Sequence, residues 1–140
     1  MHLFNTHVTQ HAIDGCIDVL KSGFLNQGPK VYEVEQKMLE RGIINPLTVN
    51  SCTAALHLSL ILSNVSGKEV ILPSQTFIAT GLAVVMANAK PVFCDIQAET
   101  LCLDPVDVES RITSHTKAIV VVHYAGKPAP MKEITDIARR

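Results

Sequence analysis

Residues 47–58, with the sequence LTVNSCTAALHL, decide the fold of this 140-residue chain. Their pattern predicts a short apolar strand over residues 47–49, a hydroxyl-rich turn, and a strongly apolar helix over residues 53–63. Such a turn directs backbone N–H groups and small hydroxyls to the positive end of a helix dipole, where a phosphate binds readily. The stretch contains neither Gly-x-Gly-x-x-Gly nor Gly-Lys-Ser/Thr, so it supports neither of the two commonest nucleotide-binding motifs. The remaining interpretation is a phosphate held by Ser, Cys and Thr, as in cofactors with a single phosphate group.

Strand and helix patterns alternate along the chain. Helices are predicted over residues 12–22, 31–40, 53–63, 77–87 and 104–112, and after Pro130 with Met131, Ile134 and Ile137 inward; further strands are predicted over residues 70–72, 91–96 and 117–122. This alternation predicts an α/β fold, a three-layer arrangement in which helices cover both faces of a mainly parallel sheet with right-handed crossovers. The helix over residues 53–63 is apolar nearly all round, so we expect it among the most buried elements.

The polar candidates follow predicted strands. In parallel sheets, ligands bind at the carboxyl ends of the strands. The segments predicted to meet at that edge are residues 51–53, residues 73–77, Asp95 and residues 123–128. Hydrogen bonds between the backbone and the residues Asp95 and Asp104 are expected to organise the loop between Ile96 and Pro105.

Composition narrows the class of protein. Net charge is −1, which points to neither nucleic acid nor an anionic membrane as a partner. The cysteines at positions 16, 52, 94 and 102 show no Cys-x-x-Cys spacing, which favours free cytosolic thiols over a disulfide framework or a zinc site. The sequence has no signal-peptide pattern and no run long enough to span a bilayer, so we expect one cytoplasmic domain.

Four motifs occur in a specific order, at residues 50–60, 69–80, 89–96 and 116–123. Together they resemble the N-terminal part of the DegT/StrS-type sugar aminotransferases, which are fold type I, aspartate aminotransferase-like enzymes that use pyridoxal 5'-phosphate (PLP). The resemblance runs from about Gly28 to Arg140, and more loosely before Gly28. It implies that residues 1–140 form the N-terminal part of the large domain of a longer enzyme, ending inside a helix.

The resemblance implies roles for three residues. It assigns Cys52 and Thr53 to phosphate binding and Phe77 to stacking on the pyridine ring of the cofactor. The family's turn usually reads Ser-Gly-Thr, and Cys52 stands at the glycine position. From the residues alone, two other interpretations stay open, because Thr53 can cap its helix and Phe77 can be a core residue.

The histidines and Cys52 provide no further site. His7 and His11 have the i, i+4 spacing of a helical metal pair but no third ligand in view, so no metal site is predicted. His57 is expected to pack in the core, and His123 is expected to take no direct part in the chemistry. Cys52 has no paired base that would activate it as a nucleophile.

The resemblance also implies an activity for the longer enzyme. An amino acid, glutamate in this family, would donate an amino group to a nucleotide-linked keto-sugar, as in amino-sugar and polysaccharide biosynthesis, and family members are homodimers. The family's Schiff-base lysine, and the aspartate that pairs with the pyridine nitrogen, lie downstream of the matched region. We therefore expect residues 1–140 to contain no catalytic residue and to be inactive alone. A PLP-dependent sugar dehydratase of the same family, or a non-catalytic remnant or interaction chain, remain alternatives.

Overall fold

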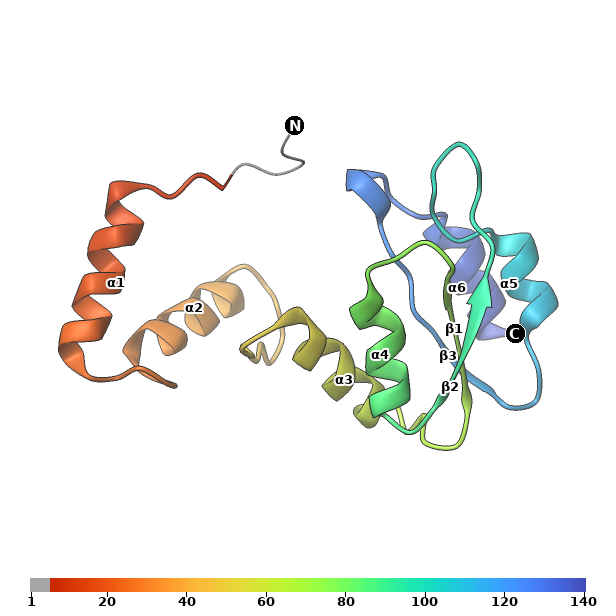
Figure 1. The fold of residues 1–140 in the computed structure, drawn as a ribbon, viewed down its shortest axis with the longest axis horizontal. Coiled ribbons are helices and arrows are strands. Elements are labelled where there is room, and N and C mark those ends of the chain that lie inside the picture. Colours follow the sequence, from red (N-terminus) through yellow and green to blue (C-terminus); the bar gives the residue numbers. More distant parts are fainter. Residues whose placement is uncertain (1–5) are drawn as a thin grey trace. The chain divides into compact units, whose positions relative to one another are not determined.

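The computed structural model describes residues 6–140, and the chain divides into two compact units, Met1–Thr48 and Val49–Arg140 (Figure 1). The first unit contains helices α1 (Gln10–Ser22) and α2 (Pro29–Glu40). The second contains three strands, four α-helices and a short 3-10 helix within its residues. No helix in the described part of the chain is both long and apolar enough to cross a membrane.

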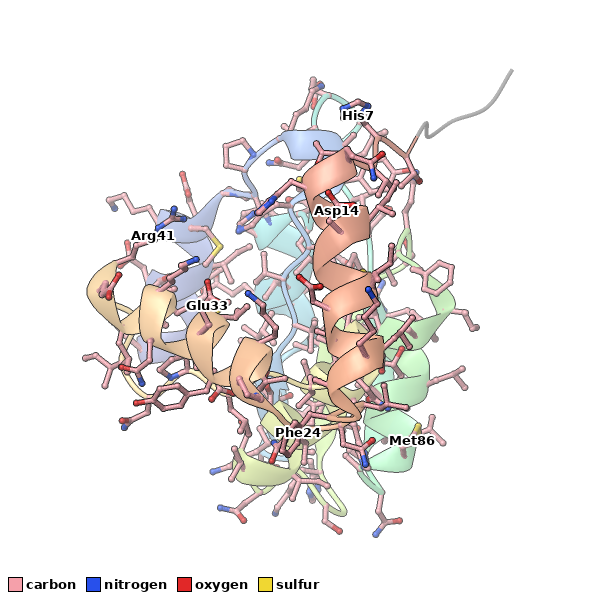
Figure 2. The ribbon with its side chains drawn as sticks, turned by 90° about the vertical axis from the view of Figure 1, so that its left-hand side faces the viewer. His7, Asp14, Phe24, Glu33, Arg41 and Met86 are labelled. Atoms are coloured by element: carbon pink, nitrogen blue, oxygen red, sulfur yellow. The ribbon has the colours of Figure 1, made fainter. Side chains whose placement is uncertain are left out.

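The first unit is a pair of amphipathic helices with clear start and stop signals. The Thr9 hydroxyl accepts a hydrogen bond from the Ala12 N–H at 3.2 Å, and Gly23 ends α1 in the left-handed region at φ 76°. Glu33 on α2 accepts hydrogen bonds from the ammonium groups of Lys30 and Lys37 at 2.8 and 2.7 Å (Figure 2). Neither helix has a buried residue, so this unit has little core of its own.

The second unit is built on a parallel sheet with the strand order β2-β1-β3. The strands are β1 (Glu69–Pro73), β2 (Lys90–Cys94) and β3 (Thr116–Ile119). The central strand pairs in parallel with both neighbours, and its apolar residues are fully buried because layers cover both faces. The predicted parallel α/β architecture is confirmed.

Helices cover both faces of this sheet (Figure 1). Helices α3 (Cys52–Leu62) and α4 (Ile78–Met86) lie on one face, and α5 (Pro105–Arg111) and α6 (Met131–Arg139) lie on the other. Adjacent residues of β1 face opposite ways, so that Val70 packs in the α3/α4 cluster and Ile71 packs in the α5/α6 cluster. The 3-10 helix η1 (Tyr124–Gly126) lies in the loop after β3.

The predicted strand over residues 47–49 is wrong. These residues form no strand, and the N–H and hydroxyl of Thr48 donate to the Glu35 carboxylate at 2.9 and 2.8 Å. A strand needs a neighbouring chain to complete its ladder, whereas here a side chain of α2 already satisfies the backbone group. Apolar character alone could not distinguish these two arrangements.

The expected deep burial of α3 is also wrong. Leu60 is its only buried residue, while the side chain of Leu62 is 81% exposed. Helix α4 covers one side of α3 through Leu56 and Leu60, whereas Leu58, Ile61 and Leu62 are exposed. Met131 was likewise expected inward but is 43% exposed, because only Ile134 and Ile137 lie on the side of α6 that meets the sheet.

Candidate functional site

The first turn of α3 is set by Ser51. Its hydroxyl accepts a hydrogen bond from the Ala54 N–H at 3.1 Å, and its carbonyl accepts from the Ala55 N–H, also at 3.1 Å. Ser51 has an extended backbone at φ −159°, as an N-cap residue should. The alternative in which Thr53 caps this helix is therefore wrong.

With Ser51 as the cap, the next two residues keep their hydrogen-bonding groups available. In the described residues, no hydrogen bond is found for the backbone N–H groups of Cys52 and Thr53, or for the Thr53 hydroxyl. Cys52 is exposed and Thr53 is half-buried. Two N–H groups and a hydroxyl at the positive end of an 11-residue helix match what a phosphate requires.

Phe77 lies directly before α4 and is 77% exposed. Its interpretation as a core residue is therefore wrong. Thr80 holds the turn that carries it, because the Thr80 N–H donates to the Phe77 carbonyl at 3.0 Å and the Thr76 and Thr80 hydroxyls are 2.8 Å apart. The ring thus presents an open apolar face from an ordered turn, as a stacking residue must.

The carboxyl ends of the three strands share one edge of the sheet because all three strands are parallel. Ser74 follows β1 and donates its N–H to the Cys94 carbonyl at 2.8 Å, where β2 ends. Asp95 and the loop after β3 begin at the same edge. The turn over residues 51–53 follows no strand, so the topological argument does not extend to it, although α3 and α4 pack against each other.

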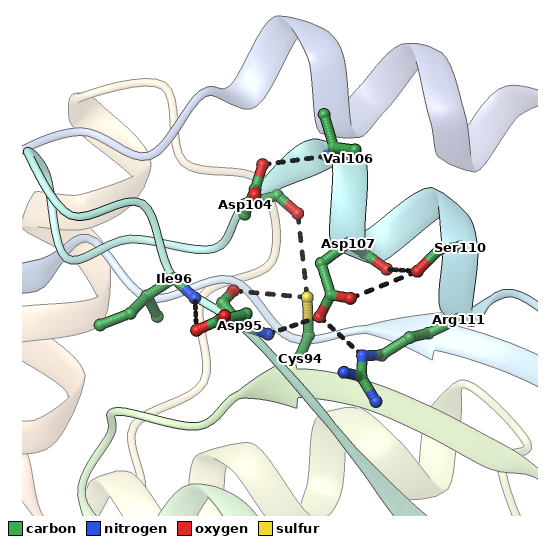
Figure 3. A network of polar contacts seen from close by, with 8 residues as sticks. All are labelled: Cys94, Asp95, Ile96, Asp104, Val106, Asp107, Ser110 and Arg111. Atoms are coloured by element: carbon green, nitrogen blue, oxygen red, sulfur yellow. Dashed lines mark hydrogen bonds and ion pairs between the residues drawn. The ribbon is translucent and has the colours of Figure 1, made fainter.

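Asp95 and Asp104 organise the loop between them, as predicted. One carboxylate oxygen of Asp95 accepts from the Ile96 N–H at 2.8 Å (Figure 3). The Asp104 N–H donates to the Asp95 carbonyl at 3.0 Å. The Asp104 carboxylate accepts from the Val106 N–H at 3.1 Å and caps α5, with Pro105 as the first helical residue.

Sequence reasoning missed Asp107, at the centre of this network. Its carboxylate accepts the Asp95 N–H at 2.7 Å and the Arg111 Nε–H at 2.6 Å (Figure 3). These hydrogen bonds hold the pKa of Asp107 well below its usual range, with that from Arg111 the largest cause. The i, i+4 spacing of Asp107 and Arg111 is readable in the sequence, but the link to Asp95 spans 12 residues and is not.

Cys94 lies inside the same network and is only 1% exposed. Burial, together with the nearby Asp107 carboxylate, raises the pKa of its thiol to about 12. The thiol therefore stays protonated and lies 3.5 Å from the Asp95 carbonyl and 3.8 Å from that of Asp104. Its role is structural, because a neutral buried thiol is a poor nucleophile.

The histidines have structural settings. The His123 Nδ1 accepts from the Ala129 N–H at 3.0 Å and so supports the loop after β3. His57 is half-buried on α3. His7 lies outside α1, so it does not share a helical turn with His11 (Figure 2).

The family model for DegT/DnrJ/EryC1/StrS aminotransferases matches residues 7–140. The chain belongs to this family. The match extends further toward the N-terminus than Gly28, and it includes both helices of the first unit.

Named relatives agree with this assignment. The chain is 45% identical over 97% of its length to the protein MJ1066 of Methanocaldococcus jannaschii, whose name states no activity. It is 37% identical over 95% of its length to a UDP-4-amino-4-deoxy-L-arabinose–oxoglutarate aminotransferase of Shewanella sediminis. It covers 36% and 35% of these two proteins.

Solved structures of aminotransferases share the fold. The PLP form of the putative sugar aminotransferase Spr1654 from Streptococcus pneumoniae superposes with a TM-score of 0.87 at 34% identity, over 94% of this chain and 34% of that one. The aminotransferase TlmJ from Streptoalloteichus hindustanus superposes with a TM-score of 0.89 at 32% identity, over 99% of this chain and 39% of that one. The chain thus spans about a third of the length of these relatives.

Proposed function

We propose that this chain supplies the phosphate-binding turn and the ring-stacking residue of a PLP-dependent sugar aminotransferase. The observation that carries the proposal is the first turn of α3, where the Ser51 cap leaves the N–H groups of Cys52 and Thr53 available. Family membership and the names of the relatives support it, since they describe aminotransferases and, in Spr1654, a PLP form. The acceptor would be a nucleotide-linked keto-sugar and the donor an amino acid, with glutamate as the expected donor.

In this proposal, Cys52, Thr53 and Phe77 hold the cofactor. The Thr53 hydroxyl and the first N–H groups of α3 bind the phosphate, and the exposed ring of Phe77 orients the pyridine ring by offset contact. PLP, when bound, supplies an electron sink and carries the amino group between the two substrates. Cys52 has a Cβ that glycine lacks, so the backbone beside it approaches the phosphate slightly less closely.

In this proposal, the rest of the activity depends on residues outside the third of the family enzymes that this chain matches. No lysine of residues 1–140 matches the family's cofactor-binding lysine, so we expect this stretch alone to transfer no amino group. The working enzyme would be a cytoplasmic homodimer, as its family resemblance implies.

A PLP titration followed by absorbance tests the two contacts in the complete protein encoded by the gene. Thr53→Ala should weaken binding by about 1.5–3 kcal/mol, the value of a hydrogen bond to a charged group. Phe77→Ala should weaken it by about 1 kcal/mol through lost stacking.

Matched controls lie elsewhere in the chain. Thr135, half-buried on α6, and Phe24, 60% exposed before α2, should be replaceable by alanine without a change in PLP affinity. Unchanged affinity in both Thr53→Ala and Phe77→Ala would remove these residues from the site. Absence of glutamate-dependent amino transfer to every keto-sugar nucleotide tried would count against the assigned substrates.

A further inference from the structure

Helix α4 begins without an ordinary side-chain cap. Its N-cap residue is Phe77, whose backbone is extended at φ −70° and ψ 145° and whose side chain makes no capping hydrogen bond. A phenyl ring cannot replace the side-chain oxygen with which Ser51 and Asp104 cap α3 and α5. Other residues must therefore hold the start of α4.

Two threonines provide this support on either side of Phe77. The hydroxyls of Thr76, directly before the ring residue, and of Thr80, in the first turn of α4, are 2.8 Å apart, so that one donates to the other. The Thr80 N–H also donates to the Phe77 carbonyl at 3.0 Å. Thr80 thus holds the residue before the ring through its side chain and the ring residue through its backbone.

Burial distinguishes Thr80 from the other polar residues. Its exposed fraction is 6%, and it is the only buried polar residue in the part of the chain that the structure describes. A buried hydroxyl costs free energy unless it has a partner, and the Thr76 hydroxyl is that partner. Valine has nearly the same shape and needs no partner, so packing alone does not account for a threonine at this position.

The direction of the Phe77 ring depends on this turn. The residue is 77% exposed, so contacts within its own unit do little to fix the ring. A stacking residue has to meet a flat ring by offset contact. If the turn is ordered before the cofactor arrives, binding does not have to supply the free energy of ordering it. The hydroxyl pair provides this order from the buried side of α4.

We propose that Thr80 is a positioning residue, whose buried hydroxyl holds Thr76 and so sets the turn from which the Phe77 ring contacts the cofactor. This inference rests on the proposed function. Thr80 acts through the turn and does not itself touch the cofactor. Its effect on PLP affinity is therefore bounded, because a residue that acts only through the ring cannot contribute more than the ring does.

Two substitutions of Thr80 in the complete protein separate positioning from packing. Thr80→Val keeps the branched shape but loses the hydroxyl, and it should weaken PLP binding about threefold in an absorbance titration, less than Phe77→Ala does. Thr80→Ser keeps the hydroxyl but loses a methyl group, and its PLP affinity should stay close to that of wild type. A residue that only packs would give the opposite order, because the lost methyl group is then the more damaging change.

A second position and a double variant complete the test. Thr76→Val breaks the same hydrogen bond from its half-buried end and should also weaken PLP binding about threefold, which keeps the test decisive if Thr80→Val does not fold. In the Phe77→Ala background, Thr80→Val should cause no further loss, because no ring remains to be positioned. The matched control is Thr135→Val, the same change at a half-buried position of α6, which should leave PLP affinity unchanged.

The outcomes separate the positioning role from the proposed function. If Phe77→Ala weakens PLP binding but Thr80→Val and Thr76→Val do not, the positioning role is wrong and the proposed function stands. Weaker binding in Thr80→Ser than in Thr80→Val, or an undiminished loss in the Phe77→Ala background, would also overturn the positioning role alone. Unchanged affinity in Phe77→Ala would remove the ring contact and the positioning role together, and unchanged affinity in Thr53→Ala as well would overturn the proposed cofactor contacts as a whole.

Discussion

The two faces of the sheet are covered by helices of different character. On one face, α6 buries Ile134 and Ile137 and presents Lys132, Glu133 and Asp136 outward. On the other, α3 and α4 bury Leu60 and Val84, while most of their outward side chains are also apolar. The exposed apolar residues of these two helices are Leu58, Ile61, Leu62, Ile78, Leu82, Val85 and Met86.

This difference shows that the hydrophobicity of a helix does not by itself predict how deeply the helix is buried. An amphipathic pattern, as in α6, predicts both that a helix is buried and which side is buried. A uniformly apolar pattern, as in α3, predicts contact with apolar surface on every side but not which contacts its own unit supplies. Extended exposed apolar surface of this kind is characteristic of interaction surfaces.

The largest expected effect tests whether the α3/α4 layer and the α5/α6 layer contribute equally to the free energy of unfolding. Val84 on α4 and Val108 on α5 are both fully buried on opposite faces of the sheet. Val84→Ala and Val108→Ala should each lower the free energy of unfolding by about 1.5–3 kcal/mol, from lost burial and a residual cavity. Urea unfolding monitored by circular dichroism measures both. A loss confined to Val108→Ala would show that the α3/α4 layer does not unfold together with the sheet.

Removing the helix caps compares the same two faces of the sheet through a smaller change in the free energy of unfolding. Ser51 caps α3 and Asp104 caps α5, each through one side-chain oxygen that accepts a backbone N–H at 3.1 Å. Ser51→Ala and Asp104→Ala should each cost about 1 kcal/mol of unfolding free energy in the same assay. A negligible cost at Ser51 alone would mean that α3 forms its first turn only with a partner or ligand in place.

Much of the second unit could be predicted because its signals are local. Buried β-branched runs mark the strands, and Asp104-Pro105 marks the start of α5, so the parallel sheet and this cap follow from neighbouring residues. The sequence leaves open whether Thr53 caps α3, because Ser51 and Thr53 are both good caps and lie two residues apart.

The errors share one physical cause, which is contact between distant residues. The pattern of residues 47–49 predicts a strand, but the Thr48 N–H donates to the Glu35 carboxylate instead of to a neighbouring strand. The hydrogen bond from the Asp95 N–H to the Asp107 carboxylate joins two segments that are 12 residues apart. The exposure of Leu62 depends on which part of α3 the rest of its unit covers. The phosphate and stacking roles of Cys52, Thr53 and Phe77 stay predictions, supported by an available helix N-terminus and an exposed ring.

A pH series tests the ion pair between Asp107 and Arg111 on α5. The pKa of Asp107 is lowered in the folded protein, mainly by its hydrogen bond from Arg111. Its contribution to stability is therefore fully present above the ordinary aspartate pKa of about 4, and is lost as the pH falls from there through the lowered folded-state pKa. The difference in unfolding free energy between wild type and Asp107→Asn should be constant from about pH 7 to about pH 5 and shrink toward about pH 3. A difference that grows on acidification would contradict the ion pair.

The smallest expected effect on stability falls on the outward sides of the helices and tests the comparison most directly. Leu62 on α3 and Val85 on α4 are 81% and 57% exposed, so Leu62→Lys and Val85→Lys should change the unfolding free energy of the 140-residue chain by no more than about 0.5 kcal/mol. The same changes should reduce self-association in sedimentation velocity, because charge interrupts the apolar surface. Met131→Lys, at a 43% exposed position of α6, provides the control and should leave the association state unchanged, because the exposed residues Lys132 and Glu133 that follow it are already charged. A cost well above 1 kcal/mol at Leu62 or Val85 would mean that these side chains are buried in solution, and that the two faces of the sheet are covered alike after all.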